Sequence, residues 1–300
     1  MKLKRSSLLI FMLPAVILYC LIFLYPTLRT ILMSFYELPS LTADSSSWSF
    51  VGIQNYKDIL SVPLFQRSLI NLLGIWLIGG AVVMVLSLLF AEILSSGVFF
   101  KRFFRSVIYL PNVISAVALG TMWLQYAFNP NWGLFHSLFE FLGLESMAGF
   151  QWTAPQNMFM SLIIAYDFGM VGYFMLMFLA AIERIPADCF EAATIEGAGA
   201  VKQFFFIKLP LLRGMLQTSF VLWSVRAVGF FVWSKIFAPI TPTPETITPM
   251  VYMYQLTFVS DVNTALNVGG GAAVGVIMTV LVLAMFLLSK LLFKTEDYSL

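Results

Sequence analysis

The sequence has few charged residues for its length. Only 11% of its 300 residues are Asp, Glu, Lys or Arg, whereas soluble domains carry about 25%. Hydrophobic residues make up 60% of the chain. So low a charge content is not typical of a soluble globular protein, and we therefore expect a protein that spans a membrane.

Histidine and cysteine are almost absent. The single histidine, His136, has no partner at metal-ligand spacing, which excludes most histidine-based metal sites. The two cysteines, Cys20 and Cys189, fall in an apolar stretch and in a polar loop, so we do not expect them to pair. The sequence therefore predicts no metal and no cofactor.

Sequence signatures of catalysis are missing as well. The dipeptide Gly-Lys does not occur, so the chain has no phosphate-binding loop of the Gly-Lys-Ser or Gly-Lys-Thr type. It also has no His-Glu-x-x-His motif and no nucleophile elbow. We expect a protein that is not an enzyme, has no nucleic-acid partner, and takes any energy from ATP through a separate subunit.

Long apolar stretches, by contrast, are plentiful. Six are long enough to cross a bilayer, which takes roughly 20 residues each. The first begins with basic residues, as a signal peptide does, but it is too long and no small-residue cleavage site follows it. The sequence predicts an all-α membrane protein, one domain over residues 1–300, with six transmembrane helices. The predicted spans are residues 8–28, 69–94, 107–128, 158–182, 214–237 and 266–288.

The basic residues are distributed unevenly around these spans. Twelve of the 17 lie on the sides that would both be cytoplasmic, four lie outside or at outer helix ends, and Arg226 lies within a span. This asymmetry agrees with the positive-inside rule and predicts that both termini face the cytoplasm. The twelve are Lys2, Lys4, Arg5, Lys101, Arg102, Arg105, Arg184, Lys202, Lys208, Arg213, Lys290 and Lys294.

A distinctive set of residues lies between the fourth and fifth spans. Glu191-Ala192-Ala193 is followed by Gly197, Ile207 and Leu209-Pro210, at six, sixteen, and eighteen and nineteen residues after the glutamate. Small residues on one helical face allow another surface to approach closely, and Gly197 allows the chain to turn before a second short helix. An amphipathic linker lying on the membrane with nothing bound is the alternative interpretation.

This set resembles the EAA loop of permease subunits of binding-protein-dependent ABC importers. The preceding residues 177–186 and the phrase at 50–56 resemble the sugar-importer branch, of the maltose and glycerol-phosphate type. Residues 240–242, Ile-Thr-Pro, depart from the Gly-Gly-Pro turn that this family often has. The resemblance implies that the loop over residues 184–213 couples to an ATPase. The implied coupling residues are Glu191, Ala192, Ala193, Gly197, Ile207, Leu209 and Pro210.

The same resemblance implies a set of partners. These would be a second permease subunit in a heterodimer, two cytoplasmic ATPase subunits, an extracellular solute-binding protein and membrane lipid. The location would be the cytoplasmic (inner) membrane of a bacterium or archaeon, and the solute a sugar, an oligosaccharide or a related polyol. The alternatives are an ABC importer for a non-sugar solute such as an amino acid or phosphate, a partner-free carrier or channel, and a membrane scaffold.

Two charges fall inside predicted spans. Asp167 and Arg226 would both lie roughly 15 Å below the outer surface, because a helix rises 1.5 Å per residue. Intramembrane charges usually face the interior and pair, so we expect these two to face each other across the pathway. Separate contacts with water or solute, or a pair between Arg226 and the companion subunit, are alternatives. Four aromatic residues could stack on sugar rings or simply pack: Trp123, Tyr126, Tyr173 and Trp223.

Overall fold

The computed structural model describes residues 5–38, 40–259 and 266–293. Lys2, Lys4 and Lys294, which entered the charge argument, lie outside these ranges. The chain divides into two compact units, which we describe separately. Unit 1 comprises residues 1–66 with 249–280, and unit 2 comprises residues 67–248 with 281–300.

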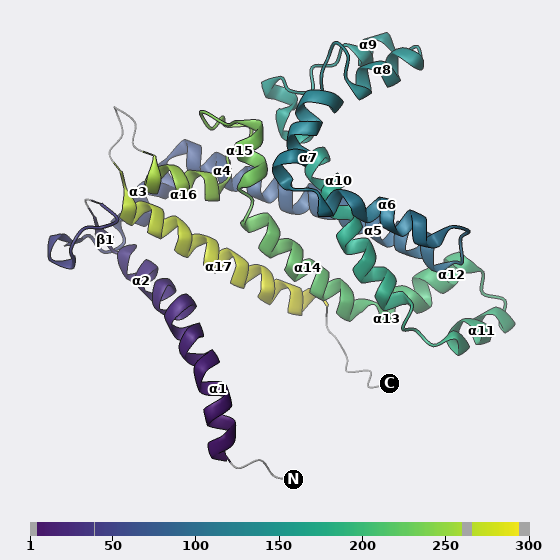
Figure 1. The fold of residues 1–300 in the computed structure, drawn as a ribbon, viewed down its shortest axis with the longest axis horizontal. Coiled ribbons are helices and arrows are strands. Elements are labelled where there is room, and N and C mark those ends of the chain that lie inside the picture. The colour runs from purple at the N-terminus through teal and green to yellow at the C-terminus, as the bar shows by residue number, and fades with distance from the viewer. Residues whose placement is uncertain (1–4, 39, 260–265, 294–300) are drawn as a thin grey trace. The chain divides into compact units, whose positions relative to one another are not determined.

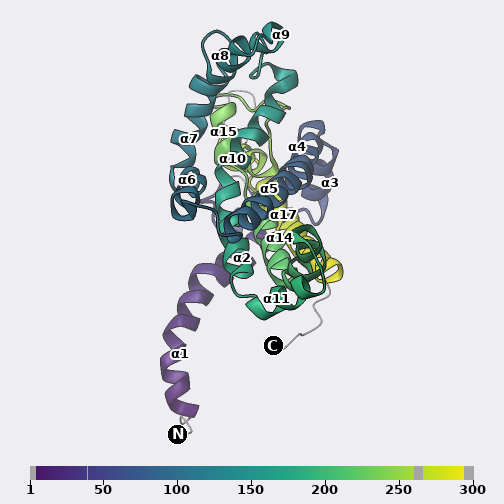
Figure 2. The ribbon, with the colours of Figure 1, turned by 90° about the vertical axis from the view of Figure 1, so that its right-hand side faces the viewer.

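Unit 1 begins with a long apolar rod. Helix α1 (Arg5–Tyr19), a π-helical turn η1 (Cys20–Leu24) and α2 (Tyr25–Met33) follow one another without a break, as Figures 1 and 2 show. An 18-residue stretch between Phe11 and Met33 has a mean hydropathy of 2.1, and no residue from Phe11 to Met33 is buried. A helix that is apolar all round yet unburied requires lipid or another protein around it.

The rest of unit 1 contains a small departure from the all-α expectation. Two-residue strands, β1 (Tyr36–Glu37) and β2 (Ser49–Phe50), pair antiparallel, with Tyr36 opposite Phe50. The buried Asn55 fixes this ribbon, because its amide nitrogen donates to the carbonyl oxygens of Ser34 at 2.9 Å and Tyr36 at 3.0 Å. The remaining elements are η2 (Ser45–Ser47), α3 (Gln54–Ser61), α16 (Pro249–Phe258) and the start of α17 (Val268–Leu292).

Unit 2 is built around α10 (Pro155–Ile182), which is the most buried of the long apolar helices. It packs along α5 (Gly80–Ser95), where the Ser87 hydroxyl donates to the carbonyl oxygen of Val171 at 2.8 Å. Helix α5 is the end of a continuous 33-residue apolar helix, Pro63–Ser95, whose earlier parts are α4 (Pro63–Gly74) and the π-helical turn η3 (Ile75–Gly79).

The predicted third span, residues 107–128, is not one straight helix. Helix α6 (Lys101–Val113) ends at an extended Ile114, and α7 (Ala116–Met122) with η4 (Trp123–Ala127) continues at an angle of 100°. The bend has a local cause. Ser115 is also extended, and its hydroxyl accepts a hydrogen bond from the Ala118 N–H, which caps a new helix.

The predicted fifth span, residues 214–237, is broken too. Helix α14 (Arg213–Val228) is 16 residues long, which is too short to cross a bilayer alone, and α15 (Val232–Phe237) follows after a three-residue break. Between α7 and α10 lie α8 (Leu134–Phe141) and α9 (Glu145–Ala148), beyond the end of α7 in Figure 2. Within the described residues, four helices are long and apolar enough to span a membrane. The number rises to six if two bent pairs each count as one span, namely Lys101–Val113 with Ala116–Ala127, and Ala200–Leu211 with Arg213–Val228 at an angle of 68°.

Candidate functional site

The loop over residues 184–213, hereafter the 184–213 loop, contains a short helix that ends at Gly197. Helix α11 (Ala187–Ile195) carries Glu191, Ala192 and Ala193. The Ala198 N–H bonds to the Ala193 carbonyl at 2.9 Å, and the Gly197 N–H bonds to that of Thr194 at 3.0 Å. These two bonds form a Schellman cap, and Gly197 has the left-handed φ of +80° that this cap requires. The glycine's place in the sequence motif therefore marks the end of the helix.

A second limb returns toward the body of unit 2. It consists of α12 (Ala200–Gln203), the π-helical turn η5 (Phe204–Lys208) and α13 (Leu209–Leu211), and it contains the half-buried Ile207, Leu209 and Pro210. Gln203 joins the two limbs, because its amide nitrogen donates to the Thr194 hydroxyl at 3.1 Å and to the Ala198 carbonyl at 2.9 Å. The loop is thus a braced helical hairpin.

The tip of this hairpin exposes apolar side chains. Ile195 at the end of α11 is 88% exposed, and Val201 in α12 is 71% exposed. Glu191 and Ala192 are also exposed, whereas Ala193 is half-buried. Large apolar side chains on short polar-flanked helices are typical of surfaces that contact another protein.

Lys208 ties the hairpin to a long apolar helix. Its ammonium nitrogen lies 2.6 Å and 2.8 Å from the two carboxylate oxygens of Glu92 near the end of α5. The same nitrogen lies 5.2 Å from the centre of the Phe190 ring in α11. Lys208, which lies on the second limb, therefore contacts both α5 and the first limb, α11. Our sequence analysis did not select Glu92 or Lys208 as site residues, because pairing across 116 positions leaves no local pattern.

Asp167 and Arg226 do not form the direct pair that we predicted. Asp167 is 3% exposed, and neither of its carboxylate oxygens has a hydrogen-bond partner within the described residues. Arg226 instead lies over the ring of Tyr173, 4.6 Å from its centre, with a nitrogen 3.8 Å from the Met170 sulfur. The prediction is wrong because equal depth in the membrane does not determine the directions in which the two side chains point. Tyr173 lies six positions after Asp167, turned by about 120° around α10.

The four aromatic candidates fall into two classes. Trp223 is 2% exposed, and its indole nitrogen donates to the Trp76 carbonyl at 2.9 Å, so the structure supports the packing interpretation for it. Trp123 is 8% exposed and packs on Phe168. Tyr126 is 60% exposed, and Tyr173 is half-buried. Of these four residues, only the two tyrosines are not buried.

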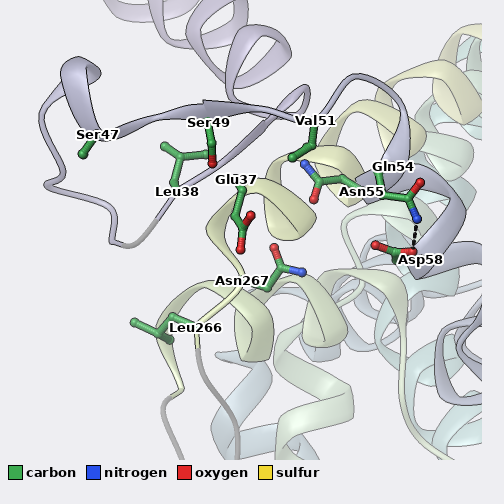
Figure 3. A pocket seen from close by; sticks show the side chains of 10 residues that line it. All are labelled: Glu37, Leu38, Ser47, Ser49, Val51, Gln54, Asn55, Asp58, Leu266 and Asn267. Carbon is green, nitrogen blue, oxygen red and sulfur yellow. Dashed lines mark hydrogen bonds between the residues drawn. The ribbon is translucent and has the colours of Figure 1, made fainter.

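Unit 1 contains a polar pocket of about 780 Å³ that the sequence analysis did not anticipate. Figure 3 shows the side chains of Glu37 and Asn267 directed toward each other across it, with the Gln54 amide donating to Asp58 at 2.6 Å on its rim. None of the predicted pathway residues lines this pocket. Within the part of the chain that the structure describes, no group of three His, Cys, Asp or Glu residues is placed to hold a metal ion.

The fold of the whole chain resembles solved bacterial importers. A crystal structure of a bacterial ABC transporter involved in the import of the acidic polysaccharide alginate matches with a TM-score of 0.79 and 20% identity, covering 98% of this chain and 97% of that chain. A second structure, of the bacterial alginate transporter with its alginate-pentasaccharide-bound periplasmic protein, matches with a TM-score of 0.77 and 21% identity, covering 96% and 94%.

Similar sequences point the same way. The arabinooligosaccharides transport system permease protein AraP of Halalkalibacterium halodurans is 30% identical over 90% of this chain and 82% of its own. The sn-glycerol-3-phosphate transport system permease protein UgpA of Pectobacterium atrosepticum is 28% identical over 94% and 92%. The family model of the binding-protein-dependent transport system inner membrane component matches residues 83–295. The chain therefore belongs to the family of inner membrane components of binding-protein-dependent transport systems.

Proposed function

We propose that this permease docks its 184–213 loop onto a separate ATPase subunit and passes the ATPase's movement to the membrane helices. One observation carries the proposal. The hairpin exposes Glu191, Ile195 and Val201 at its tip, while Lys208 anchors its base to Glu92 of α5. A rigid loop that is anchored to a membrane helix can transmit a movement applied at its exposed end, whereas a flexible loop would absorb that movement. The remaining coupling residues are Ala192, Ala193, Gly197, Ile207, Leu209 and Pro210.

The proposed layout is a single permease domain of six spans with both termini in the cytoplasm. Four apolar helices supply the first, second, fourth and sixth spans, and the bent pair of α6 with α7 and η4 supplies the third. Helices α14 and α15 supply the fifth, with the 184–213 loop before them. Helices α14 and α15 count together as one span, since α14 alone, with 16 residues, is too short to cross a bilayer. The distribution of basic residues supports a cytoplasmic position for the 184–213 loop.

The assembly that we propose contains a different, companion permease subunit, two ATPase subunits and an extracellular solute-binding protein. The unburied apolar rod from Phe11 to Met33 supports the companion subunit, because such a surface is stabilised by lipid and by another helix. The solved alginate transporter with its periplasmic protein supports the third partner.

We propose that the solute is a sugar, an oligosaccharide or a related polyol. Relatives named for arabinooligosaccharides and diacetylchitobiose support this class. Tyr126 and Tyr173 are the stacking candidates, and Arg226 beside Tyr173 is a hydrogen-bond donor. A phosphorylated polyol is the second candidate, because a relative is named for sn-glycerol-3-phosphate and Arg226 could pair with phosphate.

The proposal is tested by placing a bulky side chain on the hairpin. Gly197→Trp should disrupt the Schellman cap and abolish ATPase co-purification and solute uptake, while the protein remains inserted in the membrane. Gly149→Trp is the matched control, since Gly149 has open space around it and lies outside the 184–213 loop. Normal ATPase retention and uptake in the Gly197 variant would contradict the coupling role.

A further inference from the structure

The polar pocket of unit 1 has no part in the proposed coupling to the ATPase. Its lining comes from two separate parts of the chain, the segment from β1 to α3 and the residues just before α17. The lining includes two carboxylates, Glu37 and Asp58, and no lysine or arginine. A concave surface with this excess of negative charge attracts a cationic occupant.

The two carboxylates retain free acceptor capacity. Glu37, the last residue of β1, is exposed, and its carboxylate makes no hydrogen bond or ion pair with another described residue. Asp58 in α3 is also exposed and accepts one hydrogen bond, from Gln54 at 2.6 Å. A carboxylate accepts several hydrogen bonds, so this pocket presents more acceptors than its own side chains can satisfy.

Asn55 adds a buried acceptor to this set. The residue is 7% exposed, and two backbone carbonyls, those of Ser34 and Tyr36, require that its amide nitrogen faces them. The side-chain oxygen is thereby turned into the pocket, as Figure 3 shows, where no described residue donates a hydrogen bond to it. Leaving such an oxygen without a donor costs free energy, so its orientation points to a donor from outside the chain.

The chemistry of the lining selects among possible occupants. A bare metal ion is a poor match, because no three His, Cys, Asp or Glu residues come together to hold one in the part of the chain that the structure describes. A sugar ring would find no aromatic side chain in the lining, and an anionic solute would be repelled by both carboxylates. A lysine or arginine side chain fits, because it carries several N–H donors and a positive charge.

The place of the pocket in the chain indicates which protein supplies this side chain. The ribbon of β1 and β2 follows the apolar rod that ends at Met33, and Asn267 immediately precedes α17. In the six-span layout both segments lie on the outer side of the membrane. We infer that the pocket receives a lysine or arginine side chain of the extracellular solute-binding protein, with Glu37 as its counterion. The inference rests on the proposed function, which includes this partner and this layout.

The test measures the affinity of the solute-binding protein for the full transporter complex in membranes. Glu37→Lys should weaken binding at least about tenfold, because it brings two like charges together. Asp44→Lys is the matched control, since Asp44 is exposed in the same outer segment but does not line the pocket, and it should change the affinity less than about twofold. Normal membrane levels and ATPase co-purification in both variants show that the fold is intact.

A photo-crosslinking phenylalanine derivative identifies the basic residue. Placed at Ser47, at the edge of the pocket in Figure 3, it should form an adduct with the solute-binding protein close to a lysine or arginine that peptide mapping locates. Replacement of that residue by Glu should weaken binding to the unchanged transporter and restore binding to the Glu37→Lys variant.

Three results would overturn the inference while solute uptake continues. They are equal losses of affinity in the Glu37 and Asp44 variants, a Ser47 adduct with no basic residue nearby, and a Ser47 adduct with free solute instead of protein. A solute-binding protein that neither binds the complex nor supports uptake would contradict the proposed assembly as well.

Discussion

Lys208 and Glu92 form an ion pair between the 184–213 loop and α5. The two carboxylate contacts are 2.6 Å and 2.8 Å long, and the side chains are only 13% and 23% exposed. Burial of this extent reduces screening by water, so the pair is worth more than an ordinary surface pair. Helix α5 in turn packs along α10, and the pair therefore connects the loop to the most buried helix of unit 2.

Breaking this pair should weaken both stability and coupling. Lys208→Met leaves the Glu92 carboxylate mostly buried and unpaired, so we expect the free energy of unfolding to fall by about 2 kcal/mol. Uptake should fall while the protein level in the membrane is maintained. Adding Glu92→Leu should recover part of the lost stability, because no lone charge then remains. Thermal unfolding of the purified complex measures both effects, and strictly additive losses would contradict a direct interaction.

The pair between Lys101 and Glu183 provides a matched comparison. Its contact is also 2.6 Å long, but the side chains are 33% and 45% exposed. Exposed pairs contribute about 0.2–1 kcal/mol. We therefore expect Glu183→Gln to change the melting temperature far less than Lys208→Met does. An equal loss in the two variants would show that burial is not what distinguishes the pairs.

The left-handed backbone at Gly197 predicts a graded series of substitutions. No heavy atom lies within 4 Å of the position that a Cβ would take, so the cost comes from the φ of +80°. Gly197→Asn should retain most uptake, since asparagine tolerates this conformation, whereas Gly197→Val should cost about 1–2 kcal/mol or more. Uptake and ATPase co-purification measure the series. Equal activity of the two variants would argue against a conformational requirement.

Gly172 should be sensitive for a different reason. A Cβ there would overlap the Ile108 carbonyl oxygen and lie 2.7 Å from the Tyr109 Cα, so α6 could not pack against α10. Backbone atoms cannot rotate away as a side chain can, and we expect Gly172→Ala to cost about 2 kcal/mol. Gly149→Ala, with open space, is the control for thermal unfolding. Unchanged stability in the Gly172 variant would contradict the close approach.

The membrane layout can be tested with the native cysteine of the loop. Cys189 in α11 is exposed and should react with a membrane-impermeant thiol reagent only from the cytoplasmic side. In a variant with Cys20 and Cys189 replaced by Ser, a cysteine at the exposed position 140 of α8 should react only from outside. Labelling of both positions from the same side would contradict the six-span layout.

The sequence alone predicted much of the secondary structure and the turn at Gly197 in the 184–213 loop. Apolar stretches identify membrane helices because hydrocarbon thickness sets their length and composition locally. Gly197 could be assigned to a turn for the same kind of reason, since a left-handed backbone limits the residue that stands there. The breaks near Ser115 and Gly229 were missed, because apolar composition continues across them while the backbone changes direction.

The tertiary structure alone decided which side chains meet. The sequence placed Asp167 and Arg226 at similar depth, but depth follows from helical rise, whereas the direction of a side chain follows from how neighbouring helices pack. Packing turned Arg226 toward Tyr173 and left Asp167 buried without a hydrogen-bond partner in the described chain. The pairing of Glu92 with Lys208, 116 positions apart, emerges in the same way, because folding brings α5 beside the 184–213 loop.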